Sequence, residues 1–270
     1  THDGVPMAEP VRNAGGTILG ADNKAAVVVM LEAARRIVAE GRAHAGVELL
    51  FTSKEEVGLV GAYAFDAARL EAAAGYVYDQ AAPIGEIILG APSAKAIEAR
   101  FHGRAAHAGM APEEGRSAIA AAARAVADLR LGRLDETTTA NVGTITGGTA
   151  RNIVPEWCTL QAEARSHDET VLADLAASLS DCTVETEVRQ QYRAYRFRQD
   201  DLPVRLAGEA LRRAGVTPTT ALSGGAADAN VFNERGLPCA NLANGMVDIH
   251  TPDERIAVAD LDTMVDVTLA

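Results

Sequence analysis

Two adjacent glutamates, Glu55 and Glu56, come after the apolar and β-branched run Glu48–Thr52, with two residues between. Such a run is typical of a buried strand, and successive side chains on a strand point to opposite sides. Two neighbouring carboxylates at a strand end can therefore do two jobs, one holding a metal ion and the other handling a proton. Adjacent glutamates are also common at the solvated start of a helix, so this interpretation needs support from the rest of the chain.

Length and composition favour a globular α/β protein. The chain has 270 residues, more than one compact domain usually has, and 48% of them are hydrophobic. The net charge of −12 argues against nucleic acid or an anionic membrane surface as the main partner, and no apolar run reaches the ~20 residues that span a bilayer. The three cysteines lack CxxC spacing, so we expect neither a disulfide framework nor a cysteine zinc site, and a reducing cytoplasm fits best.

The first part of the chain alternates between helix and strand patterns. An apolar stretch over 25–34 predicts a helix that is buried nearly all round, with its N-cap at Asp22 or Asn23. Gly75–Tyr78 predicts a second buried strand, which ends at Asp79. Acidic residues after strands that alternate with helices are typical of a parallel sheet whose site lies beyond the carboxyl ends of its strands. A carboxylate at a helix start can also be a cap and nothing more.

From about residue 93 the pattern changes to the order β-α-β-β-α-β, the signature of a small split βαβ domain of the ferredoxin-like α+β type. The elements that we predict there are strands at 95–101, 137–145, 157–165 and 183–188, and helices at 117–129 and 169–179. Helices at 203–214 and after 258 and a strand at 239–242 most simply complete the first sheet. We therefore predict a main domain formed by 1–92 and 201–270, with an inserted domain at 93–200.

Five residues at predicted strand ends and in loops carry groups of the types that zinc and manganese accept: Asp22, Glu55, Glu56, Asp79 and His250. Two metal ions can share a bridging carboxylate and a water, and a further free carboxylate can take a proton from that water. One nitrogen ligand, three oxygen ligands and one spare acid fit such a site.

Several segments follow one another along nearly the whole chain: Leu19-Gly20-Ala21-Asp22-Asn23-Lys24-Ala25, Thr52-Ser53-Lys54-Glu55-Glu56-Val57-Gly58, Gly103 to Pro112, Arg151-Asn152-Ile153-Val154-Pro155-Glu156, and Gly224 through Asn230 on to His250. In these segments the chain resembles the M20 family of zinc metallopeptidases, and within it the peptidase T-like branch. The resemblance implies a zinc-peptidase catalytic domain with a mainly parallel sheet. It also implies that the inserted domain is the family's lid and dimerisation domain, and hence a homodimer.

The resemblance further implies a role for each residue of the site. Asp22 would bridge two Zn²⁺ ions per chain, with Co²⁺ or Mn²⁺ as other possible metals. Glu56 and His250 would bind one ion, Asp79 would bind the other, and Glu55 would be the general base.

Three residues of the inserted domain receive roles from the same resemblance. His107 would reach the active site of a partner subunit and help to stabilise the oxyanion, while Asn152 and Arg165 would approach the substrate. His107 can also be an ordinary loop histidine, and Arg165 can be a charge on the face of a strand.

The start of the chain departs from the family pattern. The family places a zinc-binding histidine in a His-x-Asp motif, whereas this chain begins Thr1-His2-Asp3-Gly4-Val5-Pro6, and alignment on Asp-Gly-Val-Pro puts Thr1 at the ligand position. Either residues are skipped after His2 and His2 is the ligand, or the site lacks one ligand. We favour the first explanation, in which the sequence holds only part of the chain, because the segment around Cys182 also looks shortened relative to the family.

We therefore predict a cytoplasmic hydrolase that cleaves amide bonds of small peptides, an aminopeptidase-like enzyme for di- and tripeptides. Glu55 would carry a proton from a metal-activated water to the leaving amine. One alternative is an N-acyl amino acid deacylase or carboxypeptidase of the same family, which would not need a free α-amine on the substrate. The other is a catalytically inactive relative that binds peptides, which would show no chelator-sensitive hydrolysis.

Overall fold

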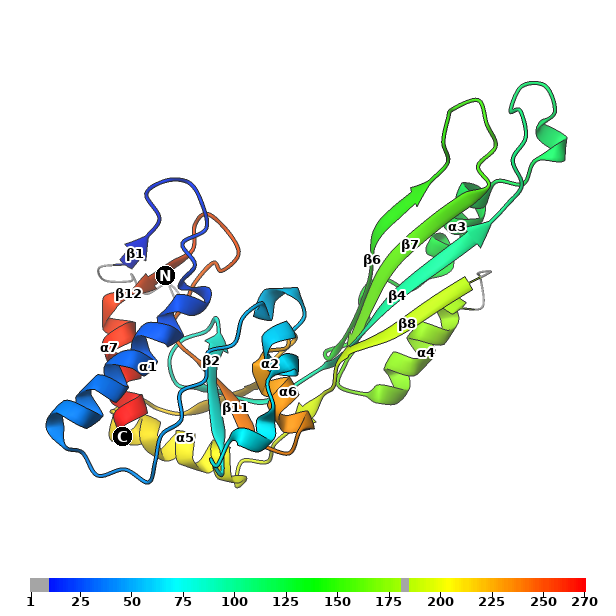
Figure 1. Ribbon diagram of the computed structural model, residues 1–270. Helices are drawn as coiled ribbons and strands as arrows, with labels where there is room; N and C mark the ends of the chain where they lie inside the picture. The colour runs from blue at the N-terminus through cyan, green and yellow to red at the C-terminus, as the bar shows by residue number, and fades with distance from the viewer. Residues whose placement is uncertain (1–9, 181–184) are drawn as a thin grey trace. The chain divides into compact units, whose positions relative to one another are not determined.

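The computed structural model describes residues 10–180 and 185–270, and the chain divides into two compact units (Figure 1). Unit 1 comprises Thr1–Ala91 and Tyr195–Ala270, and unit 2 comprises Pro92–Ala194. Within the described ranges, no helix combines the length and the apolar character that crossing a bilayer requires.

Unit 1 is built on a sheet with the strand order β10-β3-β11-β2. Its strands are β2 (Gly75–Gln80), β3 (Glu86–Ala91), β10 (Thr219–Leu222) and β11 (Cys239–Ala243), and the short β9 (Tyr195–Arg196) also pairs with β3. β10 runs parallel to β3 and β11 parallel to β2, whereas β11 is antiparallel to β3. A separate two-stranded ladder joins β1 (Pro10–Arg12) to β12 (Arg255–Ala257).

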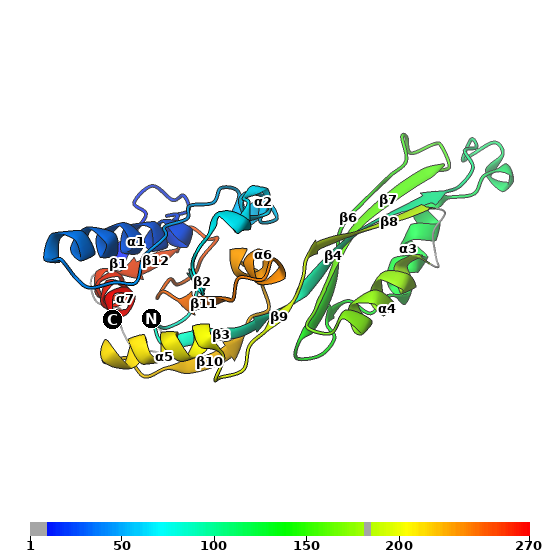
Figure 2. The ribbon, with the colours of Figure 1, turned by 60° about the horizontal axis from the view of Figure 1, so that its bottom comes forward.

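Three helices pack on this sheet and form the main core of unit 1. They are α1 (Ala21–Glu40), α5 (Leu202–Arg213) and α7 (Val258–Leu269), and α1 lies beside α7 (Figures 1 and 2). Val29 of α1, Ile87 of β3 and Met264 of α7 are each about 1% exposed and belong to one buried cluster. Burial of these side chains holds the sheet against the helices. The short helices α2 (Val60–Ala64) and α6 (Asp228–Glu234) pack on each other.

Helix α1 differs from the prediction in its burial and agrees with it at its start. Asp22 and Asn23 have non-helical dihedral angles, and Asn23 Oδ1 accepts the N–H of Ala26 at 3.2 Å, as an N-cap does. The expectation of a helix buried nearly all round is wrong. Leu31 is 53% exposed and Val38 is 83% exposed, because the sheet and α7 cover only one side of α1 within the described part of the chain.

The run Glu48–Thr52, predicted to be a strand, is irregular, and Glu55–Val57 form the 3₁₀ helix η1 instead of ending a strand. A strand needs a neighbour for its backbone hydrogen bonds, and this run pairs with none of the strands at 10–180 and 185–270. The carboxylate of Glu48 instead accepts the N–H groups of Glu71 and Ala72 at 3.0 and 2.9 Å. The run has the apolar composition of a strand, but it has no strand partner among the residues that the structure describes.

Unit 2 is an antiparallel sheet with the strand order β5-β6-β7-β4-β8, covered on one face by two helices (Figure 2). The elements are β4 (Ser93–His102), α3 (Ala118–Asp128), β5 (Gly132–Arg133), β6 (Thr138–Gly147), β7 (Trp157–Ser166), α4 (Glu169–Ser180) and β8 (Glu185–Tyr192). Alternate residues of β4 face the helices: Phe101 packs in the cluster with α3, and Ile97 in the cluster with α4. Apart from the two-residue β5, the order follows the β-α-β-β-α-β pattern of the sequence.

Leu172 of α4 tests the core of unit 2. It is fully buried against Ile97 and Ala164, so Leu172→Ala is expected to lower the free energy of unfolding by about 2–5 kcal/mol, because a cavity remains. Urea denaturation followed by circular dichroism measures this loss. Leu131→Ala is the control, because Leu131 is 40% exposed and its truncation should cost no more than about 0.5 kcal/mol. Equal losses for the two variants would contradict this packing.

Candidate metal centre

Asp22, Glu56 and His250 converge in unit 1. His250 Nε2 lies 2.9 Å from Asp22 Oδ2 and 2.9 Å from Glu56 Oε1, although His250 and Asp22 are 228 residues apart. One ligand atom from each of the three residues lies within 4.8 Å of the other two. An imidazole nitrogen with two carboxylate oxygens is a ligand set that zinc accepts. The residues present therefore fit a divalent ion.

Each of the three side chains comes from a different element. Asp22 lies at the start of α1, Glu56 lies in η1, and His250 lies in the loop between β11 and β12. His250 has a positive φ of 63°, an uncommon conformation for a residue other than glycine. Backbone strain of this kind persists where the surrounding structure holds it, often at functional sites.

Asp79 is tied to the Asp22 loop at the end of β2. Asn23 Nδ2 donates to Asp79 Oδ1 at 2.7 Å, and Asn241 Oδ1 accepts the backbone N–H of Asp79 at 2.9 Å. Asn244 Nδ2 donates to the carbonyl of Tyr78, directly before Asp79, at 2.8 Å. These asparagines hold the carboxylate in place, and the sequence prediction did not include them in the site.

Crowding and burial raise the pKa values of the other acids. Burial first, and then the charges of Asp228, Glu56 and Asp22, raise the pKa of Glu55 to about 7. Burial, together with the charges of Glu55 and Asp22, raises the pKa of Asp79 well above its usual range. So many carboxyl groups in one place favour either bound protons or bound cations.

Asp228 adds a further carboxyl group to this cluster. Burial raises its pKa, and it accepts a hydrogen bond from the Thr52 hydroxyl. Its Oδ1 atom is buried and has no hydrogen-bond partner in the described part of the chain. A buried, unpaired carboxylate oxygen is costly, which is a second sign that the cluster is suited to cations.

The pKa of His250 is also raised, but in a base a raised pKa favours the charged form. Burial alone would lower its pKa, but the neighbouring Glu56 and Asp22 carboxylates raise it. Carboxylates that stabilise the charged form of His250 would stabilise a bound cation for the same reason.

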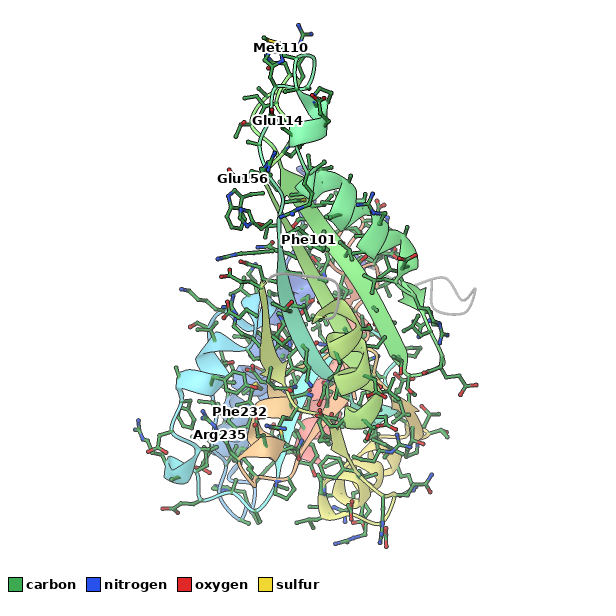
Figure 3. All side chains as sticks on the ribbon, turned by 90° about the vertical axis from the view of Figure 1, so that its right-hand side faces the viewer. Phe101, Met110, Glu114, Glu156, Phe232 and Arg235 are labelled. Carbon is green, nitrogen blue, oxygen red and sulfur yellow. The ribbon has the colours of Figure 1, made fainter. Side chains whose placement is uncertain are left out.

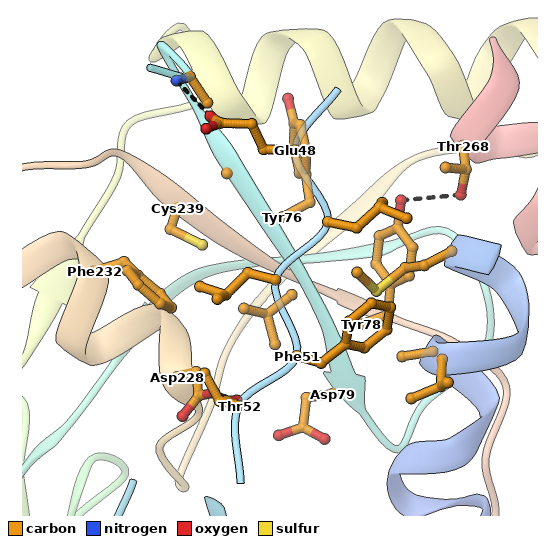
Figure 4. Close-up of a pocket in the computed structure, with 18 of the residues that line it drawn as sticks. Glu48, Phe51, Thr52, Tyr76, Tyr78, Asp79, Asp228, Phe232, Cys239 and Thr268 are labelled. Carbon is orange, nitrogen blue, oxygen red and sulfur yellow. Dashed lines mark hydrogen bonds between the residues drawn. The ribbon is translucent and has the colours of Figure 1, made fainter. Parts of the chain in front are cut away.

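The acids lie at the edge of a cavity of about 530 Å³ in unit 1. Figure 4 shows Asp79, Thr52 and Asp228 at one side of it and aromatic side chains such as Phe51 and Tyr78 further in. The apolar walls come from α1, from residues 46–52 and from β2. These walls explain the dominant contribution of burial to the raised pKa values of the acids.

The predicted residues of the inserted domain all lie in unit 2. His107 belongs to the long connection between β4 and α3, the segment that also contains Met110 and Glu114, which Figure 3 labels. Its Nδ1 accepts the N–H groups of Gly109 and Met110, both at 3.2 Å, so the neutral ring carries its proton on Nε2. The Asn152 carbonyl accepts the N–H of Ala108 at 2.9 Å and so ties a second loop to the His107 loop.

Arg165 and His2 are the remaining predicted site residues. Arg165 lies on β7, where its guanidinium donates to both oxygens of Glu163 at 3.1 Å. This ion pair agrees with a charge on a strand face, the alternative left open by the sequence. His2 lies outside the residues that the structure describes.

Comparisons with known proteins match both units to peptidases. Residues 89–189 match the family model of the peptidase dimerisation domain, and residues 5–82 match that of the M42 glutamyl aminopeptidases. The aminopeptidase PepT from Bacillus cereus is 38% identical, with a TM-score of 0.88 over 98% of this chain and 74% of that one. A tripeptidase from Staphylococcus aureus is 35% identical, with a TM-score of 0.89 over 97% of this chain and 74% of that one.

Curated sequences agree with these structures. The uncharacterized protein YqjE of Bacillus subtilis is 36% identical over 96% of this chain and 73% of its own length. Peptidase T of Salmonella arizonae is 27% identical over 94% of this chain, and the match covers 65% of that protein. The chain thus spans about two-thirds to three-quarters of the length of these relatives.

Proposed function

Because the chain belongs to the M20 family of metallopeptidases, in its peptidase T-like branch, we propose that it is an aminopeptidase for di- and tripeptides that works with two Zn²⁺ ions. Its relatives include an aminopeptidase, a tripeptidase and peptidase T, and the chain is accordingly a metal-dependent hydrolase of peptide bonds. The observation that carries the proposal is the convergence of Asp22, Glu56 and His250.

The distances around Asp22 support a division of the ligands between two ions. Asp22 would contribute to both ions, Glu56 and His250 to one, and Asp79 to the other, completed by His2. The 2.9 Å contacts of His250 favour the first group, and the bond from Asn23 to Asp79 keeps the second carboxylate beside the Asp22 loop. Co²⁺ and Mn²⁺ accept the same ligand types.

Glu55 would be the general base. Bound ions would supply a Lewis acid for the substrate carbonyl and would lower the pKa of the attacking water. Glu55 would take the proton from that water and deliver it to the leaving amine. Its half-buried position and its pKa of about 7 support this role, because a general base works best when its pKa lies near the working pH.

Unit 2 would complete the enzyme as its lid and dimerisation domain. The match of residues 89–189 to a peptidase dimerisation domain supports a homodimer. His107 would stabilise the oxyanion through Nε2–H, the tautomer that its loop favours, while Asn152 and Arg165 would contact the substrate.

The substrate class follows from the relatives. The two solved structures of 35–38% identity are called an aminopeptidase and a tripeptidase. A small peptide with a free α-amine is therefore the proposed substrate. An N-acyl amino acid would be the substrate of a deacylase, which the test below distinguishes.

Metal content and hydrolysis measured on the same protein test this function. We expect close to two zinc ions per chain, hydrolysis of di- and tripeptides, loss of both on chelation, and recovery when zinc returns. The matched control is the same tripeptide with an acetylated amine, which should be cleaved at least 10-fold more slowly. Equal cleavage of the acetylated peptide would favour a deacylase or carboxypeptidase, and absence of metal and hydrolysis would favour an inactive peptide-binding relative.

A further inference from the structure

Glu254 is a buried carboxylate four residues after His250, and it is only 1% exposed. Both of its oxygens accept backbone hydrogen bonds from the loop that carries Asp22. Oε2 accepts the N–H of Gly20 at 2.6 Å, and Oε1 accepts the N–H of Asp22 at 2.8 Å. One side chain therefore connects the two loops that supply Asp22 and His250.

Burial of the Glu254 carboxylate costs free energy, because it removes the carboxylate from water. Ile256, two residues after Glu254, and Met246, at the other end of the same loop, are buried together with Ala21 and Ala25 at the start of α1. A carboxylate in apolar surroundings is retained only when hydrogen bonds compensate for lost water, and bonds from N–H groups to a charged acceptor are the stronger kind. Here the compensation comes from the Asp22 loop.

The His250 loop is closed at its base next to Glu254. Val247 and Arg255 form an antiparallel bridge, and the N–H of Glu254 donates to the carbonyl of Thr251 at 3.2 Å. Arg255 also forms an ion pair with Asp248. The loop from 247 to 255 is thus held together by its own contacts. The hydrogen bonds of Glu254 to the Asp22 loop therefore fix the position of the whole loop, including His250.

The backbone conformation of Gly20 and a hydrogen bond of Asn23 hold the loop that carries Asp22. Gly20 has φ 74° and ψ 30°, a left-handed conformation that glycine adopts readily, and a Cβ there would lie 2.5 Å from Lys24 Nζ. On the other side of Asp22, Asn23 is bonded to Asp79 at the end of β2. Asp22 is therefore fixed from both sides, by Glu254 before it and by the sheet after it.

We propose that Glu254 is a positioning residue that sets the separation between Asp22 and His250, and thereby the affinity of the site for its metal ion. This inference rests on the proposed metallopeptidase function. Glu254 would not touch the ion or the substrate, and acts through the backbone of Asp22. Partners of this kind typically change metal affinity about 10- to 100-fold when they are altered.

Glu254→Gln tests the inference on the full chain, freed of metal and titrated with Zn²⁺ against a chromophoric chelator. The amide keeps the shape of the side chain, but it has one oxygen for two N–H groups and turns its NH₂ toward the other. We expect the dissociation constant for Zn²⁺ to rise at least 10-fold and the visible spectrum of the Co²⁺-loaded protein to change. Asp253→Asn is the matched control, because it makes the same chemical change one residue earlier on an exposed side chain and should leave both measurements unaltered.

The outcomes separate this inference from the proposed function. If wild type binds Zn²⁺ and Glu254→Gln binds it equally well, Glu254 is only a structural anchor and the inference is overturned, even if the melting temperature falls. Equal weakening by Asp253→Asn also overturns it. If wild type binds no Zn²⁺, the proposed function fails and the inference falls with it. Should Glu254→Gln not fold, Glu254→Asp, which keeps the charge but is one methylene shorter, makes the same test with the same expected loss.

Discussion

Glu55→Gln is expected to keep its metal ions and to lower kcat for a tripeptide by about 10²- to 10⁴-fold, the usual contribution of general acid–base catalysis. The amide has nearly the same size as the carboxylate but cannot accept the proton of the attacking water. Glu55 has no hydrogen bond to the group formed by Asp22, Glu56 and His250, so its replacement should leave that group in place. Steady-state kinetics and zinc content, measured on one preparation, give both quantities.

The adjacent residue is the informative control for this variant. Glu56→Gln should weaken metal binding first, and its activity should recover partly at high zinc concentration, because Glu56 Oε1 lies 2.9 Å from His250 Nε2. Zinc should restore nothing in Glu55→Gln. A Glu55→Gln enzyme with unaltered kcat, or one that loses its metal, would remove Glu55 from the role of base.

Unit 2 was predictable from the sequence because its strands and helices are long and regular. The ten residues of β4 alternate between the helix-covered face and the open face, and α3 and α4 follow helical patterns between strands. Local patterns of this kind report which face of an element is buried. They sufficed here although β4 pairs with β7 and β8, which are both far from it in the sequence.

Unit 1 was harder because several of its strands are short and their pairing is irregular. The prediction did not include β3 or β10, which are six and four residues long. Conversely, Glu48–Thr52 has the composition of a strand but no partner among the residues the structure describes. Composition reports the preference of a segment, whereas a strand also depends on what lies beside it.

The residues of the site also fall into a predictable and an unpredictable group. Carboxylates and a histidine have recognisable metal chemistry, so Asp22, Glu56 and His250 could be selected by residue type and resemblance, and the structure brings them together. Asn241 and Glu254 accept hydrogen bonds from backbone N–H groups of distant segments, and the residue types of those partners do not predict such bonds. Only the folded chain shows which backbone they reach.

The metal-free protein is expected to lose stability as the pH rises from about 5 to 9. Glu55, Asp79 and Asp228 have pKa values raised above those of an unfolded chain, which lie near 4, so the folded state holds more protons in this range. The free energy of unfolding therefore falls as the pH rises through the window. His250 acts in the same direction, because its raised pKa gives stability below about pH 6.5 that is lost above it.

Zinc should reverse this dependence, because the ions replace the protons as partners of the carboxylates. Because the pKa values of Glu55 and Asp79 are raised in the metal-free protein, zinc binding at pH 6 is expected to release at least one proton per chain. Calorimetric titrations in buffers of different ionisation enthalpy count the protons, and thermal melts with and without zinc at pH 5, 7 and 9 follow the stability.

Asp79→Asn is the control for this linkage, because it removes the carboxyl group with the most strongly raised pKa among the predicted ligands. The variant should release fewer protons on binding zinc and should show a flatter decline of stability with pH. Saturating zinc at 1,000 times its dissociation constant should add about 4 kcal/mol to the stability of wild type. A metal-free protein whose stability rises with pH over this window would mean that the carboxyl cluster is ionised without metal, and the charge argument for a cation site would fail.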